Sequence, residues 1–270
     1  MAPAYLEPII AAHRATADND GRSLDSLVEQ VSALAPCRGF RRALIGAEGM
    51  AVIAEIKRRS PSRGALSPDL DPASVAAEYV AGGATCLSVL TDESHFGGST
   101  ADLAAARAAV GVPVLRKDFT VAANDVVDAR LMGADAVLLI VAALDDVELA
   151  DFHALGVELG LDVLVETHDE GEIDRAMAVG ADLIGVNQRD LSTFEVDTDR
   201  AVRVGPSMPD SVVRVAESGV RGPDDARRLA AAGYHAVLVG ESVVTAGDRA
   251  AAVQGLRAVD RSTPSGSVAR

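Results

Sequence analysis

The sequence predicts an α/β fold, a (β/α)8 barrel, on two observations. First, four similar phrases of a glycine and a short apolar run begin at Gly83, Gly133, Gly180 and Gly233. Each follows an Ala-rich segment with helical periodicity, so the glycine ends a helix and the apolar run forms a strand. Second, four further apolar runs make eight strands alternating with helices between residues 51 and 250. Eight such units favour a closed barrel over an open, doubly wound sheet, since no GxGxxG motif follows the first strand.

The elements are expected in the following order. Residues 1–48 have helical patterns at Tyr5–Arg14 and Ser23–Leu34, and we expect them to form an added cap on a barrel at 49–255. The strands are apolar throughout, which is typical of strands buried on both faces in a parallel sheet, and their runs begin at Ala51, Gly83, Val112, Gly133, Asp162, Gly180, Val212 and Gly233. Residues 1–262 are therefore expected to be one domain, with a disordered Ser/Pro/Gly-rich tail at 263–270.

Composition narrows the classes of function. The 270 residues carry a formal net charge of −15, which argues against nucleic acid or an anionic membrane as a partner. The apolar runs are too short to cross a bilayer, and residues 1–10 lack the basic charge of a signal peptide, so we expect a cytoplasmic protein. Two cysteines and no HExxH or CxxC motif predict no metal, no cofactor and no disulfide framework.

The chain contains only two lysines, Lys57 and Lys117, among 25 basic residues. Arginine serves for surface charge but keeps its proton near neutral pH, whereas an ammonium can release one. Both lysines fall at the carboxyl ends of predicted strands. This placement indicates that they take part in chemistry.

The carboxyl ends of the strands are where barrels of this kind hold their active sites. Glu55 and Lys57 flank Ile56, so both are expected to point into the barrel. Each charged residue alone could be half of a structural ion pair. Burying several charges is costly unless they pair with one another or take part in catalysis, so a converging set predicts general acid–base catalysis. The residues of this set are Glu55, Lys57, Lys117, Glu166, Asn187 and Glu217.

Two glycine-bearing loops follow the seventh and eighth predicted strands, at Ser218-Gly219 and Gly240-Glu241. The fold commonly binds phosphate there, because glycine lets backbone N–H groups approach an anion. The alternative is that either loop is a tight turn that binds no ligand. Ser60, in the loop after the first strand, would add a hydroxyl donor.

Six segments, in order along the chain, resemble the indole-3-glycerol-phosphate synthase family; they are Ala54–Gly64, Val89–Ser99, Pro113–Phe119, Leu164–His168, Ile184–Leu191 and Val215–Val220. The resemblance covers roughly residues 5–255. It implies a carboxy-lyase of tryptophan biosynthesis that closes the ring of 1-(2-carboxyphenylamino)-1-deoxyribulose 5-phosphate, with loss of carbon dioxide and water.

The resemblance also implies roles. Lys117 matches the general acid, Glu166 the general base of the dehydration, and Lys57 the partner of the substrate carboxylate. Glu55, Asn187 and Glu217 match a supporting polar shell. For binding, the resemblance implies a polar contact at Arg189. It implies a phosphate-binding site formed by Ser60, Ser218, Gly219, Gly240 and Glu241. It also implies an apolar pocket for the aromatic ring, formed by Phe96, Phe119, Pro61, Leu138 or Leu139, and Leu191. Glu241 departs from the small polar residue common there, so only its backbone N–H is expected to help.

Three other readings remain open at this stage. Phosphoribosylanthranilate isomerase is a neighbouring phosphate-binding barrel, but Cys37 and Cys86 are badly placed for its Cys/Asp pair. The chain could also be a duplicate acting on a modified anthranilate adduct in specialised metabolism, or a non-catalytic barrel that binds a sugar phosphate. The expected partner is a small sugar phosphate, and the expected state is a monomer.

Overall fold

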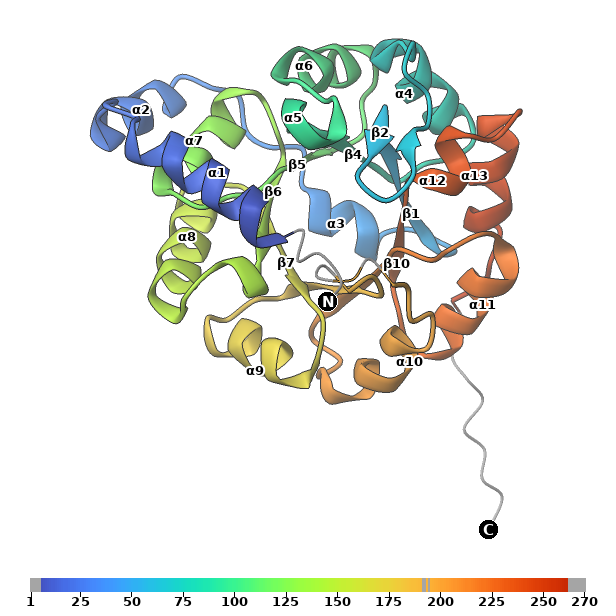
Figure 1. Cartoon of the computed structure of the whole chain (residues 1–270). Coiled ribbons are helices and arrows are strands. Elements are labelled where there is room, and N and C mark those ends of the chain that lie inside the picture. The colour runs from blue at the N-terminus through green and yellow to red at the C-terminus, as the bar shows by residue number, and fades with distance from the viewer. Residues whose placement is uncertain (1–5, 191–192, 194, 262–270) are drawn as a thin grey trace.

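A computed structural model describes residues 6–190, 193 and 195–261 of the chain. In this part, eight parallel strands close into a barrel around which helices are wrapped, as the repeated phrases predicted (Figure 1). The strands are β1 (Ala51–Ile56), β4 (Cys86–Leu90), β5 (Val114–Lys117), β6 (Ala136–Ile140), β7 (Asp162–Thr167), β8 (Leu183–Asn187), β9 (Val213–Glu217) and β10 (Ala236–Val239). Strand β1 closes the barrel by pairing with β4 on one side and β10 on the other.

The helices between the strands end as predicted. Gly83, Gly133, Gly180 and Gly233 all have positive φ, between 79° and 90°, the left-handed conformation that ends a helix. These connecting helices are α4 (Pro72–Ala81), α6 (Thr100–Ala109), α7 (Ala123–Leu131), α8 (Asp146–Glu158), α9 (Glu170–Ala178), α10 (Arg200–Val204), α11 (Pro223–Ala231) and α13 (Arg249–Arg257), with the short α5 (Glu93–Phe96) and α12 (Glu241–Val244) in two loops. None of the helices in the described residues is long and apolar enough to cross a membrane.

Strand side chains alternate between two apolar cores. On β1, Ile53 belongs to the cluster inside the barrel, while Val52 and Ala54 pack in the larger cluster between strands and helices. The strands are buried along their length because both faces are covered, which explains their continuous apolar sequence. The inner cluster fills the interior of the barrel, so a ligand of the barrel is expected at its mouth.

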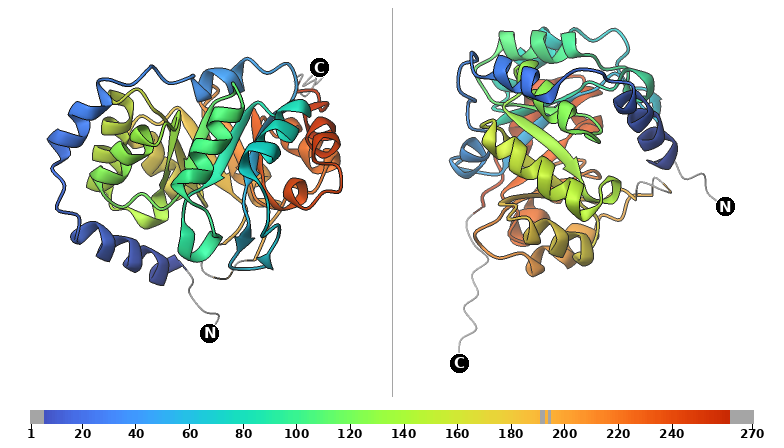
Figure 2. Two further views of the ribbon diagram at one scale, coloured as in Figure 1. Left: turned by 90° about the horizontal axis from the view of Figure 1, so that it is seen from above. Right: turned by 90° about the vertical axis from the view of Figure 1, so that its left-hand side faces the viewer.

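The N-terminal segment covers the barrel at both ends. It forms α1 (Leu6–Asp18), α2 (Leu24–Val31) and α3 (Phe40–Ile45). Helix α3 lies at one end of the barrel, whereas α1 lies at the other, with α5 and the hairpin of β2 (Arg59–Ser60) and β3 (Gly64–Ala65) (Figure 2). Phe40 and Leu44 of α3 insert into the inner cluster and close the amino-terminal end.

The N-terminal cap and the loop after β1 contain elements that the sequence did not reveal. The two predicted helices of the cap correspond to α1 and α2, but α3 and the β2–β3 hairpin were not predicted. Six residues of helix are too few for a periodic pattern to show. Tyr5 and the predicted tail at 263–270 lie outside the described residues.

Phe40→Ala should destabilise the barrel by about 3–5 kcal/mol, because it opens a cavity where α3 packs against the inner apolar cluster. Val147, which is 69% exposed on α8, provides the control: Val147→Ala should change the free energy of unfolding by less than about 0.5 kcal/mol. Urea unfolding measures both. A loss below about 1 kcal/mol for Phe40→Ala would show that α3 does not support the core.

Candidate active site

A cavity of about 300 Å³ opens at the carboxyl ends of the strands. Sixteen of the predicted site residues line it: Glu55, Lys57, Ser60, Pro61, Phe96, Lys117, Phe119, Leu138, Glu166, Asn187, Arg189, Glu217, Ser218, Gly219, Gly240 and Glu241. They come from β1, β5 to β9 and the loops that follow the strands. The structure therefore brings together residues that are up to 186 positions apart in the sequence.

The centre of the cavity is an ammonium held between two carboxyl groups. Nζ of Lys117, at the end of β5, lies 2.6 Å from Oε2 of Glu166 on β7 and 3.2 Å from Oε2 of Glu217 on β9. Asn187 donates a hydrogen bond of 2.9 Å to the other oxygen of Glu166. All four side chains are largely shielded from water, so these contacts act in a medium of low dielectric constant.

Burial and charge move the pKa values of this group in opposite directions. Burial opposes the charged form of Lys117, but the negative charges of Glu166, Glu217 and Glu55 outweigh it and hold the pKa of Lys117 above its ordinary value. Burial also opposes ionisation of Glu166, yet Lys117 and His168 bring the pKa of Glu166 below its ordinary value. Glu166 is therefore ionised and Lys117 protonated at neutral pH.

Glu217 behaves differently from Glu166. Burial, with the negative charge of Glu166 nearby, raises the pKa of Glu217 from 4.5 to about 8, although Lys117 partly opposes the change. Among the described residues its Oε1 finds no hydrogen-bond partner, and it faces Gly185 of β8, where a Cβ would lie only 2.1 Å from that oxygen. Glycine at 185 makes room for a second, neutral carboxyl group beside Lys117.

A second ammonium–carboxylate pair lies beside the first. Nζ of Lys57 is 2.5 Å from Oε1 of Glu55, confirming that both side chains point into the mouth of the barrel. A Cβ at Gly240 would lie 2.4 Å from Oε1 of Glu55 and 3.1 Å from Nζ of Lys57. The glycine after β10 thus allows its backbone to approach this pair closely.

The side of the cavity next to β9 and β10 is suited to an anion. Ser218 and Gly219 both have positive φ, of 64° and 73°, so the chain turns sharply at the end of β9. Arg63, Arg189 and Arg221 line the cavity and give it positive charge. The carboxylate of Glu241 is 3.1 Å from Nε of Arg63, which leaves the backbone of the Gly240 turn facing the cavity.

Apolar side chains form the opposite wall. The rings of Phe96 and Phe119 are 6.3 Å apart, and Leu138 with Ile140 lines the floor. Leu139 requires a correction: as the neighbour of Leu138 on β6 it points to the other face of the strand and packs against the helices. Leu191 lies outside the described residues.

Sequence reasoning did not find every residue of the cavity. Arg63 and Arg221 occur in predicted loops, but the sequence alone did not separate them from the many surface arginines. Asp92 and Asp118 also line the cavity. His13 was placed only in the N-terminal region; α1 brings it to 3.0 Å from Asp92, a contact between residues 79 positions apart that no local pattern reveals.

A (β/α)8 barrel with an ammonium–carboxylate network, an apolar wall and an anion-suited loop at its mouth defines a barrel enzyme acting on a small anionic substrate. The sequence model of the indole-3-glycerol phosphate synthase family matches residues 6–256. The chain therefore belongs to the indole-3-glycerol phosphate synthase family, the carboxy-lyases of tryptophan biosynthesis.

Comparisons with individual proteins agree. The chain is 51% identical over 253 residues to indole-3-glycerol phosphate synthase of Streptomyces griseus, covering 93% of this chain and 94% of that one. It is 55% identical over 214 residues to that of Nocardioides sp., covering 79% and 82%. Thiamine phosphate pyrophosphorylase from Pyrococcus furiosus shares the fold, with a TM-score of 0.58 at 18% identity over 78% of this chain and 94% of that one.

Glu217→Gln should make the protein more stable at pH 8. Because the pKa of Glu217 is raised on folding, the folded chain keeps a proton that the unfolded chain loses, and stability falls as pH rises from 4.5 to about 8. Glutamine removes this loss. We expect Tm to rise by roughly 2–4 °C at pH 8, as for a gain of about 1 kcal/mol, with the difference vanishing near pH 4.5.

Calorimetry across that pH range makes the measurement. The same change at the exposed Glu158 on α8 is the control and should leave Tm unaltered at both ends of the range. An equal or lower Tm for Glu217→Gln at pH 8 would show that Glu217 is not held neutral.

Proposed function

We propose that the residues of this mouth carry out indole-3-glycerol phosphate synthase chemistry, the ring closure of 1-(2-carboxyphenylamino)-1-deoxyribulose 5-phosphate with loss of carbon dioxide and water. One observation carries the assignment of roles: the ammonium of Lys117 lies between the carboxyl groups of Glu166 and Glu217 at the end of the barrel. The family match does not favour a non-catalytic barrel or another substrate.

The reaction makes three demands on the protein. An acid must polarise the ketone so that the electron-rich anilino ring attacks it. The ring carboxylate must then leave as carbon dioxide, which restores a neutral ring. Finally, water is lost, which requires a proton on the departing hydroxyl and a base that removes one from the ring system.

Lys117 supplies the first proton in this proposal. It is protonated in the folded chain, and its ammonium contacts two carboxyl groups in the cavity, those of Glu166 on β7 and Glu217 on β9. Glu166 is ionised and is held by Asn187, so it serves as the base of the dehydration step. Glu217 positions Lys117 from the opposite side and adds less negative charge than a second carboxylate would.

The substrate's two anionic groups are assigned to different places. The phosphate binds at the turns of Gly219 and Gly240, where Arg63, Arg189 and Arg221 supply positive charge. The ring carboxylate pairs with Lys57, which exchanges its contact with Glu55 for the substrate. The aromatic ring lies between Phe96, Phe119 and Leu138.

The setting of the enzyme is also part of the proposal. A biosynthetic reaction on a phosphorylated intermediate fits the cytoplasm. We expect a monomer, since one chain supplies both the acid–base residues and the anion-suited turns. The acidic composition, with a net charge of −15, fits a protein that binds neither nucleic acid nor an anionic membrane.

Lys117→Ala should lower turnover by about 10²-fold or more through loss of the general acid. The release of indole product is followed by fluorescence, which has little background because the chain contains no tryptophan. Lys117→Arg is the matched variant: arginine keeps the positive charge between the two carboxyl groups but does not give up a proton near neutral pH.

Both variants should therefore be slow, while circular dichroism remains that of the wild type. Near-normal turnover of Lys117→Arg would mean that the residue contributes charge alone. Near-normal turnover of Lys117→Ala would remove Lys117 from the mechanism.

Inorganic phosphate should inhibit competitively with the substrate, because it occupies the anion-suited turns of Gly219 and Gly240. Steady-state kinetics at several phosphate concentrations test this, with chloride at equal ionic strength as the control for screening. Noncompetitive inhibition would place the phosphate site outside the cavity.

A further inference from the structure

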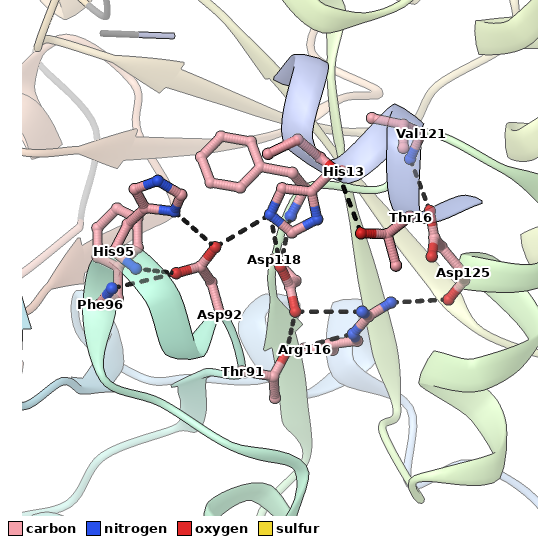
Figure 3. A network of polar contacts seen from close by, with 12 residues as sticks. His13, Thr16, Thr91, Asp92, His95, Phe96, Arg116, Asp118, Val121 and Asp125 are labelled. Carbon is pink, nitrogen blue, oxygen red and sulfur yellow. Dashed lines mark hydrogen bonds and ion pairs between the residues drawn. The ribbon is translucent and has the colours of Figure 1, made fainter. Parts of the chain in front are cut away.

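Two histidines converge on Asp92, which itself lines the edge of the cavity (Figure 3). His13 belongs to α1, Asp92 follows β4, and His95 lies on α5. Nε2 of His13 and Nδ1 of His95 are each 3.0 Å from the same atom, Oδ2 of Asp92. The three atoms lie within 4.8 Å of one another.

Asp92 is fixed in this position by its other oxygen. Oδ1 accepts hydrogen bonds from the backbone N–H groups of His95 and Phe96 and thereby caps α5. Oδ2 is left facing the two imidazoles. The side chain of Asp92 is only 3% exposed, whereas those of His13 and His95 are 24% and 32% exposed. The group is therefore anchored on one side and open to solvent on the other.

The surroundings favour a cation. Among the described residues, the ion pairs of Asp92 are with the two histidines. Asp118 adds a second negative charge, with Oδ1 4.0 Å from Nε2 of His13. Asp118 is itself held by Arg116, Thr91 and the backbone of Phe119, so it contributes charge at a distance.

We propose that His13, Asp92 and His95 form a binding site for a divalent transition metal of the Zn²⁺ class. Two imidazole nitrogens and one carboxylate oxygen are ligands that Zn²⁺ accepts, with water completing four-coordination. Ligands about 2.0–2.1 Å from a tetrahedral ion lie roughly 3.3 Å from one another, close to the two distances of 3.0 Å found here. Mg²⁺ and Ca²⁺ prefer oxygen ligands and should bind poorly.

The ion would link parts of the chain that are far apart in the sequence. It would fasten α1 to the loop after β4, and that loop contributes Asp92 and Phe96 to the cavity wall. The ring of His13 also lies 5.2 Å from that of Phe119. The metal would therefore stabilise the rim of the cavity by binding to the folded chain alone. This site does not depend on the proposed reaction.

The test is a titration of the untagged, chelator-washed full chain with Zn²⁺ against a chromophoric competitor, with Co²⁺ as a spectroscopic probe. We expect one ion per chain, a visible Co²⁺ absorption typical of four-coordination, and a rise in Tm on adding Zn²⁺. His13→Ala and His95→Ala should each weaken binding by about tenfold or more. His153→Ala, on α8, is the matched control and should bind as the wild type.

Circular dichroism of the metal-free variants checks that each is folded before binding is compared. The absence of stoichiometric binding to the wild type would overturn the proposal. Binding that survives both His13→Ala and His95→Ala would also overturn it, because the ion would then occupy another site. Since turnover is not the readout, failure here would leave the assignment of the catalytic residues untouched.

Discussion

The contact between Lys117 and Glu166 is the interaction on which the rest of the site depends. A buried ammonium or carboxylate is costly alone, and its partner must lie at the right distance and be satisfied by further hydrogen bonds. Here the distance is 2.6 Å, and Asn187 satisfies the second oxygen of Glu166. The barrel makes this possible because parallel strands end at one rim, so β5, β7, β8 and β9 each direct one polar side chain to the same point.

The same constraint explains details that otherwise look arbitrary. Gly185 has no side chain because Glu217 occupies that space. Glu217 takes up a proton more readily because it is buried and because a second carboxylate there would repel Glu166. Gly240 lets its backbone approach Glu55 and Lys57. Below this layer the barrel is filled with apolar side chains and closed by Phe40 of α3. The polar side chains that β5, β7, β8 and β9 direct inward thus meet at the mouth, where substrate can reach them.

Much of this arrangement was predictable from the sequence, because it depends on the alternation of side chains along each strand and on the order of the elements along the chain. The helix-ending glycines and apolar runs located the eight strands, and alternation along β1 placed Glu55 and Lys57 together. The features that the sequence did not reveal depend on contacts between residues that are distant in the sequence. Leu138 and Leu139 are equally apolar, and the sequence did not show which one faces inward. Helix α3 was too short to give a pattern, and His13 reaches Asp92 only through the path of the N-terminal segment.

The most direct test of this account is NMR of protein labelled with ¹³C and ¹⁵N in lysine, which should show two side chains because the sequence contains two lysines. Lys117 is identified by its loss in Lys117→Arg, and the chemical shift of its ε-carbon is followed with pH. The account predicts that Lys117 stays protonated to a higher pH than an ordinary lysine, and that Glu166→Gln lowers its pKa. A Lys117 that loses its proton near neutral pH, or that ignores Glu166→Gln, would contradict it.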